Sequence, residues 1–210
     1  EGDPPEHGPN KPGLSRQAEA AEAAALIGAE YHCLGFPDLG VFNDDPSRRR
    51  VSELIRELAP DVVITASPTD YHPDHEAISM LVRDACFAAP VVNYRIGAAA
   101  PPAAIPHLYF CDAAGARDRE GRPQGRDFAV DIGATFPLRR AMLDRHASQA
   151  AWVKKHHAID DHLAPMEAWA RSVGRDFGVA FAEGFRQYRH EAHPKTPRLQ
   201  EVLRARGLGG

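Results

Sequence analysis

A short β-branched segment between two amphipathic helical patterns constrains the fold of this chain more than any other feature. The segment Asp61-Val62-Val63-Ile64-Thr65 is almost wholly apolar, which is typical of a strand that a parallel sheet buries on both faces. Apolar residues recur at helical spacing before it, over 51–58, and after it, over 78–86. This alternation of helix, strand and helix predicts an α/β, Rossmann-like fold with a mostly parallel sheet and flanking helices.

Apolar runs and turn residues predict further elements on both sides of this unit. Helices are expected over 15–27, 139–156, 161–173 and 199–204, and strands over 29–34, 107–111, 128–132 and 179–182. Residues 1–14 are rich in Gly, Pro and charge, which predicts a loop. We expect a single domain over residues 1–210, with a polar C-terminal tail over 190–210.

The composition excludes several classes of protein. Of the 210 residues, 26% are charged and 43% hydrophobic, which is ordinary for a soluble globular protein, and the net charge of −4 gives no electrostatic case for binding nucleic acid or an anionic membrane. No apolar stretch reaches the length of a membrane-spanning helix. Three cysteines without CxxC spacing argue against a disulfide framework, so we expect buried thiols at Cys86 and Cys111 and a cytoplasmic location.

Two histidines follow the central strand within one helical turn. His72 and His75 are three residues apart, and i and i+3 residues lie on the same side of a helix. Asp74 can accept a proton from an imidazole nitrogen, and Asp70 and Tyr71 add a carboxylate and a phenol. Ligands of open α/β sheets bind outside the carboxyl ends of the strands, which is where these residues are expected. The pattern favours a metal site, and a polar helix start with exposed histidines is the alternative.

The motif and its neighbours resemble a known family. Residues 64–77, with the sequence ITASPTDYHPDHEA, are similar to the second signature of the PIG-L/LmbE-like zinc N-deacetylases. Further segments in the same order also resemble this family, at 16–28, 81–85, 106–112, 146–149 and 182–186. The resemblance covers roughly residues 15 to 190.

This resemblance implies a Rossmann-like fold with one Zn²⁺ ion that serves the hydrolysis of an N-acetyl group on an amino sugar or its conjugate. It implies that His75 ligates zinc, that His72 stabilises the oxyanion or protonates the leaving amine, and that Asp74 orients its neighbour. The residues that it places at or near the substrate are Asp70, Tyr71 and His146. The partner would be a small N-acetylated substrate, and a homo-oligomer is a further expectation.

The chain departs from the family in one respect. The family's other two zinc ligands and its general base come from an Ala-His-Pro-Asp-Asp motif, and this sequence has His-Pro pairs only at 72–73 and 193–194. Catalytic zinc usually takes three protein ligands. We therefore expect a zinc-dependent N-deacetylase domain that is incomplete at its N-terminus, and whose activity depends on the motif that this sequence lacks. Two alternatives remain: an inactive relative that binds a sugar conjugate or a partner, and a structural domain whose histidines are incidental.

Overall fold

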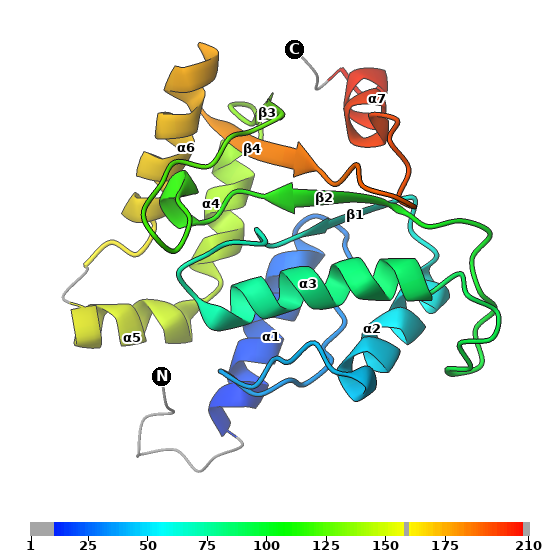
Figure 1. Cartoon of the computed structure of the whole chain (residues 1–210). Coiled ribbons are helices and arrows are strands. Elements are labelled where there is room, and N and C mark those ends of the chain that lie inside the picture. The colour runs from blue at the N-terminus through cyan, green and yellow to red at the C-terminus, as the bar shows by residue number, and fades with distance from the viewer. Residues whose placement is uncertain (1–10, 158–159, 208–210) are drawn as a thin grey trace. The chain divides into compact units, whose positions relative to one another are not determined.

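The computed structural model (Figure 1) describes residues 11–157 and 160–207. These residues form two compact units. Of the described residues, unit 1 contains 11–33, 131–157 and 160–182, and unit 2 contains 34–130 and 183–207. Unit 2 contains the HPDH motif, residues 72–75, and nearly all of the sheet. None of the described helices combines the length and the hydropathy that crossing a membrane requires.

The sheet has four strands in the order β1-β2-β4-β3. β1 (Val62–Thr65) runs parallel to β2 (His107–Cys111), whereas β2 runs antiparallel to β4 (Ala182–Gln187), and β3 (Phe128–Asp131) lies beside β4. The prediction of an α/β fold is confirmed, but the prediction of a mostly parallel sheet is wrong, because this sheet is mixed. An apolar run indicates that a strand exists and not which way it points, since direction depends on the path of the connecting chain.

Two helices cover one face of this sheet. α2 (Asp45–Leu58) begins after Asp44, whose carboxylate accepts a hydrogen bond from the backbone N–H of Ser47 at 2.9 Å. α3 (Pro73–Ala88) packs against α2, and Figure 1 shows it running along β1 and β2. The core between these elements consists of Val51, Ile55, Leu81, Ala85, Cys86, Ala89, Leu108 and Phe110.

The opposite face of β2 is covered by the C-terminal helix α7 (Arg198–Ala205). Side chains alternate along a strand, so Tyr109 points away from the core that Leu108 and Phe110 enter. The Tyr109 hydroxyl donates a hydrogen bond to Gln200 Oε1 at 3.1 Å and accepts one from the backbone N–H of Leu199 at 3.1 Å. The predicted helix over 199–204 is thereby confirmed.

β1 differs from the strand that the sequence predicts. Its apolar residues suggest burial on both faces, but Ile64 is 48% exposed. Among the residues that the structure describes, β1 pairs with β2 alone and lies at an edge of the sheet. One face of β1 is therefore open in this structure.

The cysteines agree with the prediction of unpaired thiols. All three are free, with Cys33 exposed, Cys86 buried and Cys111 of intermediate burial. Burial raises the pKa of the Cys86 thiol to about 12, because the interior disfavours the charged thiolate. Cys86 is therefore a neutral core residue at physiological pH.

Unit 1 is built from the helices α1 (Lys11–Ala25), α4 (Phe136–Asp144), α5 (Ala147–His157) and α6 (Ala164–Phe177). The Glu19 carboxylate on α1 accepts hydrogen bonds from the backbone N–H of Ser148, at 2.9 Å, and from its hydroxyl, at 2.6 Å. Phe136 stacks on Phe181 with ring centroids 3.8 Å apart, and the Arg171 guanidinium lies 4.4 Å from the Phe181 centroid. Polar and aromatic contacts therefore both hold this unit together.

Several predicted boundaries in unit 1 are wrong. Residues 29–34 form no regular strand, and residues 11–14 belong to α1 rather than to a loop. The single helix predicted over 139–156 is two helices, and the strand predicted over 179–182 is β4, which begins at Ala182. The part of the predicted N-terminal loop that precedes residue 11 lies outside the described residues.

The end of α6 shows why one of these boundaries moved. The sequence predicts a stop at Gly174, but this glycine lies inside the helix, where an added Cβ would meet Val179 O at 2.6 Å. The helix ends at Gly178, whose φ of 73° is the left-handed conformation typical of a helix C-cap. Gly174 therefore permits close packing, and Gly178 terminates the helix.

Candidate functional site

The site begins with His72, the N-cap residue of α3. Its Nδ1 accepts a hydrogen bond from the backbone N–H of Asp74 at 3.2 Å, so the imidazole takes the place that a Ser or Asp side chain usually holds. Pro73 follows at the first helical position, where no backbone donor is required. Because Nδ1 is an acceptor, the neutral ring of His72 carries its proton on Nε2.

His75 has the opposite arrangement. Its Nδ1 lies 3.1 Å from Oδ1 of Asp70, and the Asp70 side chain is only 5% exposed whereas that of His75 is 46% exposed. The Nδ1–H of His75 therefore donates to the carboxylate, which leaves the lone pair on Nε2 free. A carboxylate that accepts from the second ring nitrogen is the usual partner of a metal-ligating histidine.

The two imidazoles lie together, as the i, i+3 spacing predicts. The rings of His72 and His75 are stacked, with centroids 4.7 Å apart and an interplanar angle of 28°. Tyr71 contacts both rings edge-on, at centroid distances of 5.9 Å and 5.8 Å, and is 71% exposed. The motif thus forms a compact cluster with one exposed aromatic ring.

Asp74 has a different partner from the imidazole that the sequence suggests. Its carboxylate accepts hydrogen bonds from the backbone N–H groups of Leu39, at 2.7 Å, and Val41, at 3.4 Å. Asp74 therefore ties the loop before α2 to the start of α3, and Asp70 is the carboxylate that orients His75. Adjacent residues on a helix diverge, so the sequence neighbour of a histidine is a poor candidate for its partner.

The backbone of Asp70 is hydrogen-bonded to the buried carboxylate of Glu76. Glu76 is 9% exposed and accepts a hydrogen bond from the backbone N–H of Asp70 at 2.8 Å. Arg119 donates to the same carboxylate through Nε, at 3.1 Å, and through Nη2. Sequence reasoning missed this pair, although an acidic residue in the first turn of a helix is a general signal of a stabilised N-terminus.

A second network holds the loop between β1 and α3. Arg186 on β4 donates from Nη2 to Ser67 Oγ, at 2.7 Å, and to Gln124 Oε1, at 2.9 Å. The amide of Gln124 in turn donates to the backbone carbonyl of Thr69 at 2.8 Å. Ser67 and Arg186 are 119 positions apart in the sequence, and no local pattern connects them.

The sixth predicted residue lies in the other unit. His146 is in unit 1 at the turn between α4 and α5, where its backbone N–H donates to Leu143 O at 3.1 Å. Asp70, Tyr71, His72, Asp74 and His75 all lie in unit 2. The role of His146 at the substrate stays a prediction.

The residues present supply part of a zinc site. In the described portion of the chain, no group of three or more His, Cys, Asp or Glu side chains is placed to hold a metal ion. His75, with its free Nε2 and its carboxylate partner, fits the requirements of one zinc ligand. A catalytic zinc usually needs three such ligands, so this cluster does not hold the ion by itself.

The opposite tautomers of the two imidazoles can be tested directly. At about pH 8.5, where an unperturbed imidazole is neutral, ¹⁵N chemical shifts of labelled protein should show Nε2–H on His72 and Nδ1–H on His75. Replacing Asp70 with alanine should shift His75 towards the Nε2–H form and leave the ring tautomer of His72 unchanged, because His75 donates to Asp70 through its ring whereas His72 donates through its backbone N–H. Equal tautomer populations for both rings in the unmodified protein would contradict the geometry.

Comparison with known proteins finds a family similar to the first part of the chain and several structures of similar fold. Residues 1–86 match the PIG-L family, described as GlcNAc-PI de-N-acetylase. The fold resembles the conserved protein TT1542 from Thermus thermophilus, with 26% identity and a TM-score of 0.67 over 87% of this chain and 78% of that one. It also resembles N,N'-diacetylchitobiose deacetylase from Pyrococcus horikoshii, with 20% identity and a TM-score of 0.68 over 87% and 67% of the two chains.

A third similar structure is that of an enzyme whose reaction is not deacetylation. It is GalB, the 4-carboxy-2-hydroxymuconate hydratase from Pseudomonas putida, with 20% identity and a TM-score of 0.68 over 92% of this chain and 79% of that one. Likeness of fold alone therefore does not decide the reaction. The family match over residues 1–86 includes the whole HPDH motif.

Proposed function

We propose that the HPDH motif of this chain forms part of a Zn²⁺-dependent hydrolase site that removes an N-acetyl group from an amino sugar or its conjugate. One observation carries the proposal: His75 presents a free Nε2 lone pair beside a His72 ring whose Nε2 bears a proton. A metal ligand and a proton donor thus lie side by side in the turn that the PIG-L family match covers. The identity of the family supports deacetylation over other uses of this pair.

The two histidines suit different needs of amide hydrolysis. Attack on the amide carbonyl creates an oxyanion, and the amine must gain a proton before it leaves. The Nε2–H of His72 can donate to either atom, and the positive end of the α3 dipole favours negative charge at the same place. A zinc ion bound through His75 and further ligands would polarise the carbonyl and lower the pKa of a bound water.

The remaining residues of the cluster position these groups and the substrate. Asp70 is buried and already paired with His75, so we propose that it acts through His75 rather than by touching substrate. Tyr71 is exposed next to both imidazoles, and its ring offers an apolar face against which a sugar can pack. Arg119 and Glu76 keep Asp70 in place.

A second candidate function is binding of a sugar conjugate without chemistry. It is favoured by the lack, in the part of the chain that the structure describes, of a cluster of three metal ligands. Under this alternative the HPDH cluster still recognises a polar ligand. It would not activate water.

Acetate release separates the two candidates. This chain, joined to the segment that supplies the remaining zinc ligands and the general base and supplied with Zn²⁺, would be incubated with an N-acetylglucosamine conjugate, and acetate would be followed by a coupled assay with and without a chelator. We expect zinc-dependent release of acetate, with the free amine as the second product. Binding of the conjugate without any acetate in the presence of zinc would instead establish the second candidate. The matched control is the N-methylsulfonyl analogue, whose sulfonamide cannot yield acetate.

A further inference from the structure

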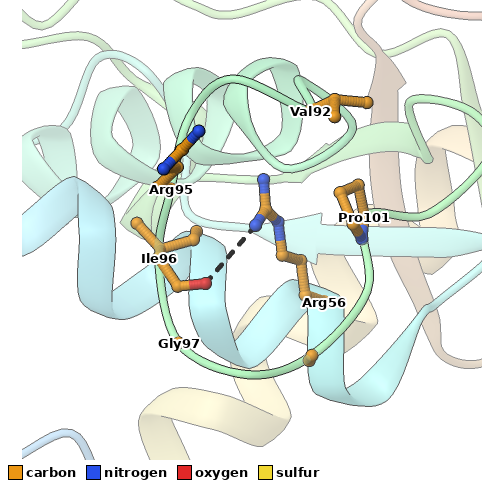
Figure 2. Close-up of a pocket in the computed structure, with 7 residues that line it drawn as sticks. Arg56, Val92, Arg95, Ile96, Gly97 and Pro101 are labelled. Carbon is orange, nitrogen blue, oxygen red and sulfur yellow. Dashed lines mark hydrogen bonds between the residues drawn. The ribbon is translucent and has the colours of Figure 1, made fainter.

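A cavity of about 420 Å³ that is widely open to solvent lies in unit 2. Figure 2 shows the residues that line it, and it lies at the opposite end of α3 from the histidines. His72 caps the N-terminus of α3, and the loop that follows the C-terminus of α3 lines the cavity. The helix has 16 residues, so the two places are about 24 Å apart along its axis. The residues that line the cavity are Arg56, Val92, Arg95, Ile96, Gly97, Ala99 and Pro101.

The central feature of this cavity is a buried arginine. Arg56 on α2 is 6% exposed and donates from Nε to Ala89 O at 2.8 Å and from Nη2 to Val91 O and Tyr94 O at 2.9 Å and 2.8 Å. These acceptors are neutral backbone carbonyls. Within residues 11–157 and 160–207, no Asp or Glu side chain forms an ion pair with Arg56. A buried charge without a counter-charge is unfavourable.

One nitrogen of this guanidinium has donor capacity to spare. Nη1 carries two hydrogens, and its recorded acceptor is Ile96 O at 3.4 Å, the longest contact of the set. Figure 2 shows the guanidinium inside the ring that the loop makes around the cavity. Arg95 adds a second cation on the exposed rim, and the cavity lining contains no acidic side chain.

We propose that this cavity binds a small organic carboxylate. Guanidinium groups form their strongest hydrogen bonds with carboxylates and phosphates. Ile96 and Pro101 give the cavity an apolar lining and the 76% exposed Val92 gives it an apolar edge, which favours an anion with a short hydrocarbon body over inorganic phosphate. The cavity volume lies within the range of small-molecule sites. The bound carboxylate would supply the counter-charge that the buried Arg56 lacks.

The carboxylate of Glu53 lies near the cavity and would repel an anionic ligand, and this repulsion can be tested. Glu53 precedes Arg56 by three residues on α2, and a Cβ added at Gly97 would collide with its carboxylate. The negative charge of Glu53 therefore reaches the rim of the cavity at Gly97. Removing this charge should strengthen the binding of an anion.

Ligand-observed NMR and calorimetry with isovalerate, at low ionic strength, test the proposal on the full chain. The neutral amide isovaleramide has nearly the same shape, and inorganic phosphate has charge without an apolar body. We expect isovalerate to bind at least about tenfold more tightly than either control, as a charge-assisted hydrogen bond implies. Equal binding of isovalerate and isovaleramide, or no binding of isovalerate, would overturn the proposal.

Substitutions on the rim assign the binding to this cavity. Arg95→Gln should weaken isovalerate binding about fivefold or more, and Glu53→Gln should strengthen it about twofold or more, because each removes one charge from the rim. Both side chains are outside the core, so the variants should fold. The matched control Arg175→Gln, an exposed arginine of unit 1, should leave the affinity unchanged. If Arg95→Gln and Glu53→Gln also leave it unchanged, the cavity is not the site.

Discussion

Replacing His75 with alanine, in the protein that joins this chain to the remaining zinc ligands, is expected to reduce kcat/KM for acetate release at least about a thousandfold, because the change removes a proposed metal ligand. The free energy of unfolding should change little, since the side chain is 46% exposed and its contacts are an ion pair with Asp70 and ring contacts with Tyr71 and His72 at the surface. Zinc content of the purified protein, measured by mass spectrometry, should fall together with the activity. Activity, metal content and urea denaturation would be measured on the same preparation.

Two companion variants make this result specific. Asp70→Ala keeps the ligand and removes the carboxylate behind it, so a smaller loss of about 10–100-fold is expected. His32→Ala removes another exposed histidine, one that pairs only with the exposed Glu30 at 3.3 Å, and should leave both activity and zinc unchanged. An active His75→Ala variant with normal zinc content would refute the assignment of His75.

The largest expected effect on stability comes from Leu81 on α3. Leu81 is fully buried in the core between α2, α3 and β2, so Leu81→Ala should lower the free energy of unfolding by about 2–5 kcal/mol through lost burial and an incompletely filled cavity. Urea denaturation followed by circular dichroism measures the change. Because α3 carries the HPDH turn, the same variant should also lose activity at temperatures where it begins to unfold.

The adjacent residue provides the matched control. Met80 precedes Leu81 on the same helix but is 41% exposed, so Met80→Ala should change the free energy of unfolding by no more than about 0.5 kcal/mol. Alanine is also the stronger helix former, which works against any loss. Comparable destabilisation by the two substitutions would show that the packing around α3 differs from that described.

The local parts of the site could be predicted from the sequence. Pro73 marks the first position of α3, and the spacing of His72 and His75 places both rings on one side of a single turn. Such features depend on residues within four positions of one another, where backbone geometry fixes the outcome. The amphipathic pattern of α2 and the apolar run of β2 were sufficient for the same reason.

The long-range features of the fold and of the site could not be predicted from the sequence. The antiparallel direction of β4 depends on how the intervening chain returns to the sheet, which no local pattern encodes. The contact of Arg186 with Ser67 and Gln124 joins three distant segments. The choice between Asp70 and Asp74 as the partner of His75 required the bend of the loop before α3, which turns Asp70 inwards and leaves Asp74 facing Leu39.

The bond between Asp74 and the loop at Leu39 has a consequence for divergence among relatives. Because these bonds tether the HPDH turn, a change in the length of the segment 38–41 would shift the positions of the two imidazoles, as a substitution beside them would. Insertions and deletions in that segment therefore offer a route to retune selectivity while every side chain of the HPDH turn is retained. The length of this loop is therefore a starting point for altering the site while its side chains are kept.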